Sequence, residues 1–497
     1  MRFQLLPRRF TALAAAALIV VLAVSGLALA QDRPPAPTGY KPPIFGTLSP
    51  ESIRLDETGT RLFQSKEQPC PGCPRRHPWL AVGEVLGINV LYNVVNLIIK
   101  PEEEKIYFKT YPKIWWNNIS YGFEWDDNTF MVNQFGHPYQ GNNYFNAGRG
   151  NGLSFWESAP LAALGSLTWE YMGERHKPSL NDLVMTTMGG ISLGEMFHRT
   201  AWLIRDPRLT GKARLTREIL ATLVDPITGA NRFISGDAGK VVEKPAEYVP
   251  TSLHAVFDAG VLWRGEDLSF TSASGEPFLQ LDLGYGTLAT GRSKQPFDAF
   301  FVDMRFGGGG AISEAIVRGR LYGRELGDAP DNDTNPSRHL MAVMGYDYHN
   351  NSAYQFGGQS IAAVFTGVRA FSPTWKLVTT LAGGVLVLGA MDSIYYDGPE
   401  RQYDFGPGFL YGAGTVLLRK GLPFARANYN GLWMHTVDGA QADHWTQALR
   451  FDLIVPVRGR LGVGTTAEFI RRKSYYDAAD DVLQRFPQMR VYLSWLK

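Results

Sequence analysis

The chain has few charged residues for its length, and this shortage narrows the kinds of protein it can be. Charged residues make up 19% of the 497 residues, while aromatic residues reach 12% and glycines number 53. Few charges together with many aromatics and glycines are typical of a membrane β-barrel rather than a soluble enzyme. The formal net charge of +2 gives no electrostatic reason to expect nucleic acid as a partner.

Long apolar runs are missing after Ala30. No run of eighteen apolar residues follows it, so the sequence predicts no membrane-spanning helix. Any segment that crosses a membrane is then expected to be a barrel strand, because only helices and closed barrels satisfy their backbone groups in lipid.

Residues 1–30 are interpreted as a signal peptide. Three arginines precede an apolar run from Ala12 to Ala23, and Ala28 and Ala30 form a small-x-small cleavage site. No cysteine follows the apolar run, so a lipobox is missing as well. A retained N-terminal anchor is the alternative. We expect an exported protein whose mature chain is close to neutral.

Cysteine is the scarcest residue type of interest, with only Cys70 and Cys73 in the chain. Both stand in the Pro-rich segment 31–78, which we interpret as a periplasmic linker. An exported compartment favours a disulfide between them. A redox dithiol and half of a zinc site are the alternatives, but zinc needs four ligands and only His77 is near. We expect no metal and no cofactor.

From Phe278 onward, apolar residues alternate with polar ones at a period of two. Leu449, Phe451 and Leu453, for example, alternate with Arg450 and Asp452. One apolar face and one face with Asp and Arg is typical of a barrel strand between lipid and lumen. A soluble β-sandwich is the alternative. The expected strands lie near 278–290, 298–306, 314–323, 338–348, 353–366, 375–389, 406–418, 422–435, 444–455, 460–472 and 486–496.

An even strand number requires one more strand. We expect residues 119–132 to form a hairpin whose first arm, near 115–126, closes the barrel. The predicted fold is mainly β: an outer-membrane antiparallel β-barrel of about 12 strands, with an inserted α-helical block that plugs or caps the lumen. The predicted units are the signal peptide 1–30, the linker 31–78, an amphipathic helix with its connection 79–112, a family domain of hairpin plus inserted helices 113–275, and barrel strands 276–497.

The inserted block carries polar residues inside apolar runs, where a charge has to be paired or hydrated. Helices are expected over about 152–171, 178–204 and 212–224, and Gly189 and Gly190 allow close approach of another helix. We expect a polar network that comprises Arg149, Glu157, Glu170, Glu174, Asn181, Asp182 and Glu195. A buried network of this kind is often structural.

Several motifs follow one another through this block. They are Asn133 with His137-Pro-Tyr-x-Gly141, Tyr144-Phe-x-x-x-Arg149-x-Asn-Gly152, Phe155-Trp-Glu-Ser158, Gly165-Ser-x-x-Trp-Glu-Tyr171, Pro178-Ser-x-Asn-Asp182 and Gly189-Gly with Gly194-Glu195. Over about 92–206, the sequence resembles an uncharacterised Gram-negative envelope family, domain of unknown function 3943. The resemblance implies an envelope protein and no particular activity.

Four functions remain open for the block. It can be a structural network in the lumen, or the gate of a small-molecule channel. It can be the site of a lipid hydrolase or acyltransferase, with His137 as general base, Glu170 or Glu195 as its orienting carboxylate and Ser154, Ser158 or Ser166 as nucleophile. It can hold a metal through Glu195 and His198, although a di-iron bundle needs a second Glu-x-x-His pair, which we do not find.

The expected surroundings follow from these observations. We expect the protein in the outer membrane of a Gram-negative bacterium, with outer-membrane lipid and the barrel assembly machinery as partners. No soluble protein partner is evident from the sequence, and an enzyme is the less favoured reading.

Overall fold

The computed structural model describes residues 72–267, 269–270, 273–288, 293–308, 310–327, 337–396 and 398–496. The predicted signal peptide and most of the predicted linker, including Cys70, lie outside these residues. The disulfide between Cys70 and Cys73 therefore stays a prediction.

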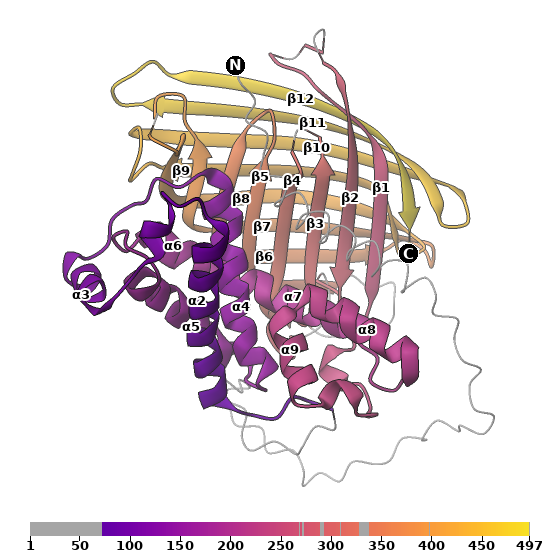
Figure 1. The fold of residues 1–497 in the computed structure, drawn as a ribbon. Helices are drawn as coiled ribbons and strands as arrows, with labels where there is room; N and C mark the ends of the chain where they lie inside the picture. Colours follow the sequence, from indigo (N-terminus) through magenta and orange to yellow (C-terminus); the bar gives the residue numbers. More distant parts are fainter. Residues whose placement is uncertain are drawn as a thin grey trace.

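A closed barrel of twelve antiparallel strands forms the C-terminal half of the chain (Figure 1). Each strand pairs with its neighbour in sequence, and β1 closes the ring by pairing with β12. The strands are β1 (Leu253–Arg264), β2 (Gly275–Tyr285), β3 (Phe300–Gly307), β4 (Ile312–Glu325), β5 (Ser337–Asn350), β6 (Gln355–Ala370), β7 (Trp375–Asp392), β8 (Tyr403–Arg419), β9 (Leu422–His435), β10 (Ala442–Arg458), β11 (Leu461–Tyr476) and β12 (Val482–Leu496). The predicted twelve-stranded antiparallel barrel is confirmed.

The twelfth strand is not the one we expected. The predicted hairpin over 119–132 is wrong, because Pro112–Tyr121 is helix α3, with a proline at its start. The closing strand is β1, in a region that we had assigned to the family domain. Only Asp258 interrupts the apolar run from Ala255 to Trp263, so the alternation of β1 is weak in sequence. The barrel consequently begins at Leu253 instead of 276, and the helices precede it instead of being inserted.

The two faces of the barrel wall differ in polarity. Arg426 on β9 contacts Asp282 on β2 at 3.0 Å, and because these strands are not neighbours, both side chains point into the lumen. Strand register then places Asp303, opposite Asp282, on the same face. The outward face is apolar, as shown by the exposed side chains of Phe451, Leu453 and other residues of β10. The predicted alternation of lumen-facing charges and outward apolar residues is confirmed.

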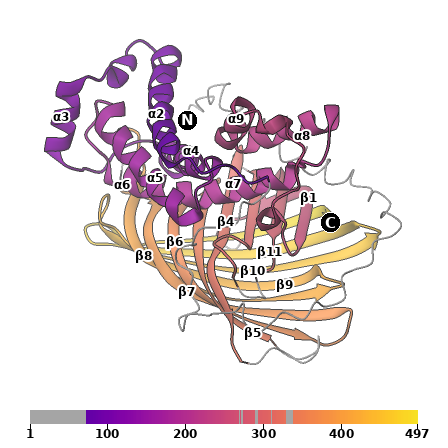
Figure 2. The same ribbon diagram turned by 90° about the horizontal axis from the view of Figure 1, so that it is seen from below.

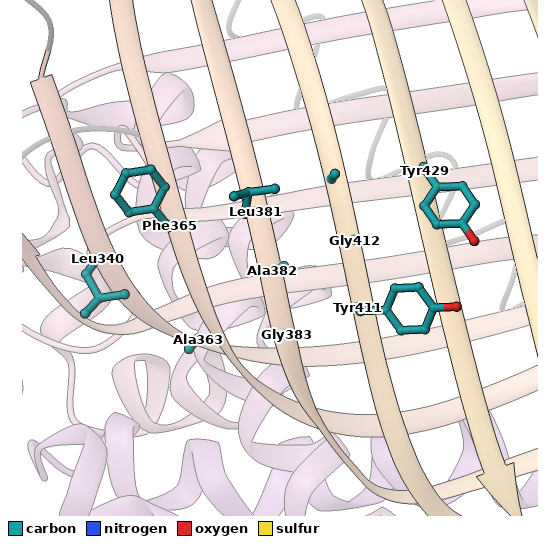
Figure 3. A pocket seen from close by; sticks show the side chains of 10 residues that line it. Leu340, Ala363, Phe365, Leu381, Ala382, Gly383, Tyr411, Gly412 and Tyr429 are labelled. Carbon is teal, nitrogen blue, oxygen red and sulfur yellow. The ribbon is translucent and has the colours of Figure 1, made fainter.

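The apolar outer surface includes a shallow depression over strands β5 to β9 (Figure 3). Its volume is about 330 Å³, and Phe365, Leu381, Tyr411 and Tyr429 line it. A depression of this composition on an outward face is part of the apolar belt, in which the Tyr411 and Tyr429 hydroxyl groups are the polar side-chain atoms of the lining.

The helices form one unit that we call the helical block, residues 78–248. Its α-helices are α2 (Pro78–Ile99), α3 (Pro112–Tyr121), α4 (His137–Gly150), α5 (Phe155–Thr168), α6 (Leu180–Val184), α7 (Gly190–Ile204), α8 (Gly211–Val224) and α9 (Pro226–Ile234). Three π-helical turns interrupt them, namely η3 (Val132–Gly136), η4 (Trp169–Gly173) and η5 (Met185–Gly189). Short 3₁₀ turns are η2 (Lys105–Phe108), η6 (Asp237–Gly239) and η7 (Ala246–Tyr248). The expected helices near 79–99, 152–171, 178–204 and 212–224 are present, whereas α4 and α9 were not foreseen.

The helical block packs against the outside of the barrel wall and does not plug or cap the lumen. Tyr346, whose register places it on the outward face of β5, donates a hydrogen bond from its hydroxyl to the Gln134 carbonyl at 2.8 Å. Tyr403, on the outward face of β8, accepts a hydrogen bond from the Asn133 amide at 2.8 Å. Outward aromatic residues such as Phe300 are buried in the same core as Phe145 of α4. This part of the outer wall therefore provides an apolar surface for the helical block to pack on, whereas the lumen is lined by charged side chains.

The contact extends from one rim of the barrel to the other. Arg199 of α7 donates to the Pro296 carbonyl, in the β2–β3 connection, at 3.2 Å. Asp127 accepts from the backbone N–H of Glu400, in the β7–β8 connection, at 3.2 Å. In an up-and-down barrel these two connections lie at opposite rims, so the block covers the full height of the wall. Figures 1 and 2 show it alongside the strands.

One helix of the block departs from the sequence expectation. Helix α2 is long and apolar enough to cross a membrane, and only 17% of its most apolar 18-residue stretch is buried inside the protein. We had predicted no such helix after Ala30, because no run of eighteen apolar residues follows it; in α2, Glu84 and three asparagines interrupt the apolar run.

Close backbone packing joins α4 to α7. Gly141 of α4 and Gly190 of α7 face each other so closely that a Cβ atom at Gly190 would overlap the backbone of Gly141. We predict that Gly190→Ala lowers the free energy of unfolding by about 1–3 kcal/mol, because the two helices have to separate. Thermal unfolding in detergent measures this. Gly83→Ala on α2, where a Cβ meets nothing within 4 Å, is the control; an equal loss in both variants contradicts the prediction.

Candidate functional site

The π-helical turns mark the most unusual part of the helical block. Such turns are rare and occur frequently at functional sites. Turn η3 carries Asn133 and leads into His137, η4 carries Glu170, and η5 directly follows α6 with Asp182. The three turns thus present these polar side chains around one region of the block.

An acidic cluster occupies this region, formed by Asp126, Glu170, Glu174 and Asp182. Asn181 donates from its side-chain amide to Asp126 at 2.7 Å and to Asp182 at 2.9 Å. The backbone N–H of Ser179 donates to Glu170 at 2.8 Å. One ring nitrogen of His137 lies 3.5 Å from the Asp182 carboxyl group. No arginine or lysine forms an ion pair with Glu170, Glu174 or Asp182 among the described contacts.

Without an arginine or lysine partner among the described contacts, the carboxyl groups of this cluster bind protons more readily. Burial, reinforced by neighbouring carboxylates, raises the pKa of Glu170 and of Asp182 well above the ordinary values. Burial and the Asp126 carboxylate raise the pKa of Glu174 to about 8. Burial lowers the pKa of His137, against the opposing effect of Asp126. Near neutral pH Glu170, Glu174 and Asp182 are therefore expected to be protonated, while His137 is neutral.

The cluster connects the barrel wall to the surface of the block. Asn133 donates at 2.6 Å to Asp126 and at 2.8 Å to the Tyr403 hydroxyl on β8. At the other side, His176 is exposed and lies 4.0 Å from Glu174. The cluster is therefore joined to the barrel wall by hydrogen bonds through Asn133 and lies within 4.0 Å of an exposed histidine.

In a second polar cluster, a carboxylate forms ion pairs with two arginines. Glu195 of α7 lies 2.8 Å from Arg149 of α4 and 2.8 Å from Arg199, one turn along its own helix. Arg149 also donates to the Leu153 carbonyl at 2.6 Å. All three charged side chains are buried, and the two guanidinium groups lower the pKa of Glu195 against the effect of burial. This cluster joins α4 to α7, and Arg199 extends it to the barrel rim.

A buried pair of His198 and Asp225 adjoins the second cluster. Their side chains meet at 2.9 Å, and the other ring nitrogen of His198 lies 3.2 Å from the Tyr248 hydroxyl. Tyr248 in turn stacks on Trp202 with ring centroids 4.6 Å apart. Because His198 and Asp225 are completely buried, they fix α9 and the entry into β1 rather than meet a solute.

The predicted network is thus divided into separate sites. Arg149 pairs with Glu195, whereas Glu170, Glu174, Asn181 and Asp182 belong to the acidic cluster. Glu157 belongs to neither, since it completes the capping box of α5 with the N-cap residue Ser154 and pairs with Arg76 at 2.7 Å near the surface. Asp126 was missed because we assigned it to a hairpin turn, and Arg199 was missed although its spacing from Glu195 is typical of a helical ion pair.

The residues proposed for catalysis are not assembled into a catalytic group. Apart from Asp182, His137 has a close contact with the Thr186 hydroxyl at 3.4 Å. Ser154 caps a helix, Ser166 donates to the Asp182 carbonyl at 3.5 Å, and Ser158 packs beside Gly148. Glu195 and His198, the candidate metal pair, have different partners, and in the described residues no group of three or more potential ligands could hold a metal.

Residues 122–227 match the model of a family described as a domain of unknown function (DUF3943), which confirms the resemblance seen in the sequence. The match contains the acidic cluster and the cluster around Glu195. No curated protein matches the chain.

Solved structures with a similar chain course include several porins. The NanC porin shares 7% identity at a TM-score of 0.26, over 47% of this chain and 98% of that one. The KdgM porin shares 6% sequence identity at a TM-score of 0.22, over 48% of this chain and 98% of that chain. The outer membrane channel DcaP of Acinetobacter baumannii shares 9% sequence identity at a TM-score of 0.21, over 50% of this chain and 96% of that chain.

The cluster around Glu195 predicts a large effect on stability. Glu195→Gln leaves Arg149 and Arg199 buried without a carboxylate, which costs about 3–5 kcal/mol of unfolding free energy. Glu157→Gln, the matched change at an exposed pair, costs about 1 kcal/mol or less. Thermal unfolding in detergent compares the two. Equal melting temperatures would show that the buried pair contributes nothing.

The acidic cluster predicts a pH dependence of the opposite sign to that of ordinary ion pairs. Because the pKa of Glu174 is raised from 4.5 to about 8, the folded protein binds more protons than the unfolded chain. The contribution of Glu174 to stability is therefore fully present below pH 4.5 and is lost as the pH rises through about 8. Glu174→Gln is expected to reduce this loss, and Glu157→Gln is not. Melting temperatures of the two variants between pH 5 and about 9 measure this. If melting temperature falls equally steeply with pH in both variants, the raised pKa of Glu174 is refuted.

Proposed function

We propose that the protein is an outer-membrane β-barrel that forms a channel for small polar solutes, with the helical block held on the outer wall of the barrel. The single observation that supports this proposal most is the unequal lining of the lumen, with charged pairs on one wall and small residues on the other.

The charged wall is built from strands on both sides of the β1–β12 seam. Arg490 of β12 lies 3.3 Å from Glu468 of β11, and Arg450 of β10 lies 3.0 Å from Asp452. Further lumen pairs join Arg318 to Asp347 and Arg305 to Glu314. Since each cation has a nearby anion, the wall is polar without a strong excess of either sign, which suits uncharged or zwitterionic solutes.

The opposite wall of the lumen is formed by β6 to β8, and its small side chains leave space in the lumen beside the charged wall. Its lumen-facing positions, fixed by register, are Ala362, Thr380, Ala382, Gly384, Gly412 and Gly414. Most of these positions are partly exposed, and on β9 the lumen-facing Asn430 is exposed. Small side chains with neighbouring amides are expected to line a water-filled passage.

Two ion pairs narrow the passage. The contact of Arg426 with Asp282 crosses the lumen between β9 and β2 at 3.0 Å. Nearer one rim, Arg472 of β11 lies 2.5 Å from Asp392 at the end of β7. The constriction is thus assigned to lumen side chains, and solute size is limited by these pairs.

The location follows from the same features. A closed barrel with an apolar belt satisfies its backbone hydrogen bonds and suits a lipid bilayer. Together with the predicted signal peptide, this favours the outer membrane, with outer-membrane lipid as neighbour and the barrel assembly machinery as the route of insertion.

The constriction gives a direct test of the channel. The double variant Arg426→Ala, Asp282→Ala removes both ends of the pair across the lumen and leaves no unpaired charge. We predict a higher single-channel conductance in planar lipid bilayers than for the native protein, because the passage is wider. Lys420→Ala, in the exposed turn between β8 and β9, is the control and should conduct like the native protein. If neither the native protein nor the double variant conducts ions, the channel is excluded.

A further inference from the structure

We infer that the helical block is itself embedded in the membrane and that the outer face of α2 contacts lipid acyl chains. This inference rests on the proposed function, because it requires the barrel to lie in a bilayer. The occupant to which it commits is the hydrocarbon of the surrounding lipid.

The first argument is the position of the block on the barrel wall. It packs on part of the outward face of β2 to β8. It also contacts connections at both rims, through Arg199 to Pro296 and through Asp127 to Glu400. On the other strands, this outward face is the apolar belt that meets lipid. A bilayer around the barrel therefore meets the block at the depth of its hydrocarbon, so the outer surface of the block has to be apolar.

The second argument is that α2 provides such a surface. Figure 2 shows α2 on the side of the block that faces away from the barrel. Its exposed large apolar side chains lie on one side of the helix, with the exposed Gly83 in the gap between Leu80 and Leu86. They are Trp79, Leu80, Leu86, Val90, Leu91, Val94, Val95, Ile98 and Ile99. At 1.5 Å per residue, its 22 residues span about 33 Å, close to the thickness of a hydrocarbon core.

The third argument is the direction of every strongly polar side chain on α2. Glu84 accepts hydrogen bonds from Asn151 at 2.8 Å and from Asn231 at 3.0 Å, both inside the block. Asn89 donates to Thr168 at 2.7 Å, and Asn93 donates to the Gly173 carbonyl at 2.7 Å. Asn96 donates to the carbonyl of Tyr92 on the helix itself. The exposed apolar side of the helix is consequently free of polar groups that would need water.

The fourth argument is the composition at the ends of the helix. Trp79, 85% exposed, stands at the N-terminal end, three residues after Arg76. Beyond the C-terminal end come charged residues from Lys100 to Lys105, followed by exposed Tyr107, Tyr111 and Trp116. Tryptophan and tyrosine with charged neighbours are enriched where a membrane-embedded segment reaches the two interfaces. A soluble face would not need this arrangement.

Spin labels test the inference in the full-length protein. The background is Cys70→Ser, Cys73→Ser, and single cysteines replace Val90, Val94 or Ile98 on α2, Leu453 on the outer face of β10, or Lys420 in the exposed turn. Each variant is reconstituted into phosphatidylethanolamine and phosphatidylglycerol vesicles. Electron paramagnetic resonance then compares collisions with oxygen, which concentrates in hydrocarbon, and with a water-soluble nickel chelate.

The expected result is high oxygen and low nickel accessibility at all three α2 positions, as at Leu453, and the reverse at Lys420. If Leu453 behaves as expected but the α2 positions are accessible to nickel, α2 lies in water and the inference fails while the barrel proposal stands. If the α2 positions are shielded from both reagents, protein covers them, a second copy or a partner, and the inference also fails. If Leu453 itself is accessible to nickel, the barrel is not in the bilayer and the proposed function fails.

Discussion

Closure of the barrel between β1 and β12 is the constraint on which the other features depend. A sheet with open edges would leave unpaired N–H and C=O groups, which are costly in a bilayer and invite aggregation in water. Nine register pairs from Val256 and Leu496 to Arg264 and Gln488 remove these edges. Since β1 directly follows the helical block, closure also brings the block to the wall, where Tyr248 and the adjoining His198 and Asp225 hold the connection.

The protein accommodates buried charge in two physically different ways. In the lumen and around Glu195, opposite charges meet at about hydrogen-bond distance, so each ion is compensated by a partner. In the acidic cluster, Glu170, Glu174 and Asp182 have no arginine or lysine partner among the described residues, and burial raises their pKa values. The first arrangement keeps its groups charged, whereas in the second the raised pKa of Glu174, about 8, makes its charge sensitive to pH near neutrality.

Placing the block on the outer wall separates these two arrangements in space. The lumen is left to its own side chains, so a passage through it does not require the helices to move. The acidic cluster communicates with the barrel through Asn133 and Tyr403, on the outward face of β8. An influence of proton binding on the barrel would therefore act through the wall, and an embedded α2 would make lipid the environment of the opposite side of the block.

The sequence by itself determined the barrel, eleven of its strands and the nature of its two faces, because period-two alternation of residues such as Leu453 and Asp452 is a local property. It also indicated the helices with strong periodicity and the residues that resemble a known family. It did not reveal β1, whose run around Asp258 is apolar on both faces, or α4, whose asparagines and glycines have low helix propensity.

Only the tertiary structure decided which polar residues meet. Glu157 and Glu195 look alike in sequence, yet one completes the capping box of a surface helix and the other is buried between two arginines. Likewise, the side of the wall on which the block packs depends on outward aromatics such as Phe300 and Tyr346, which are far from the block along the chain. The physical reason is that pairing, burial and protonation depend on distances between side chains, and those distances are set by packing across elements that the sequence keeps far apart.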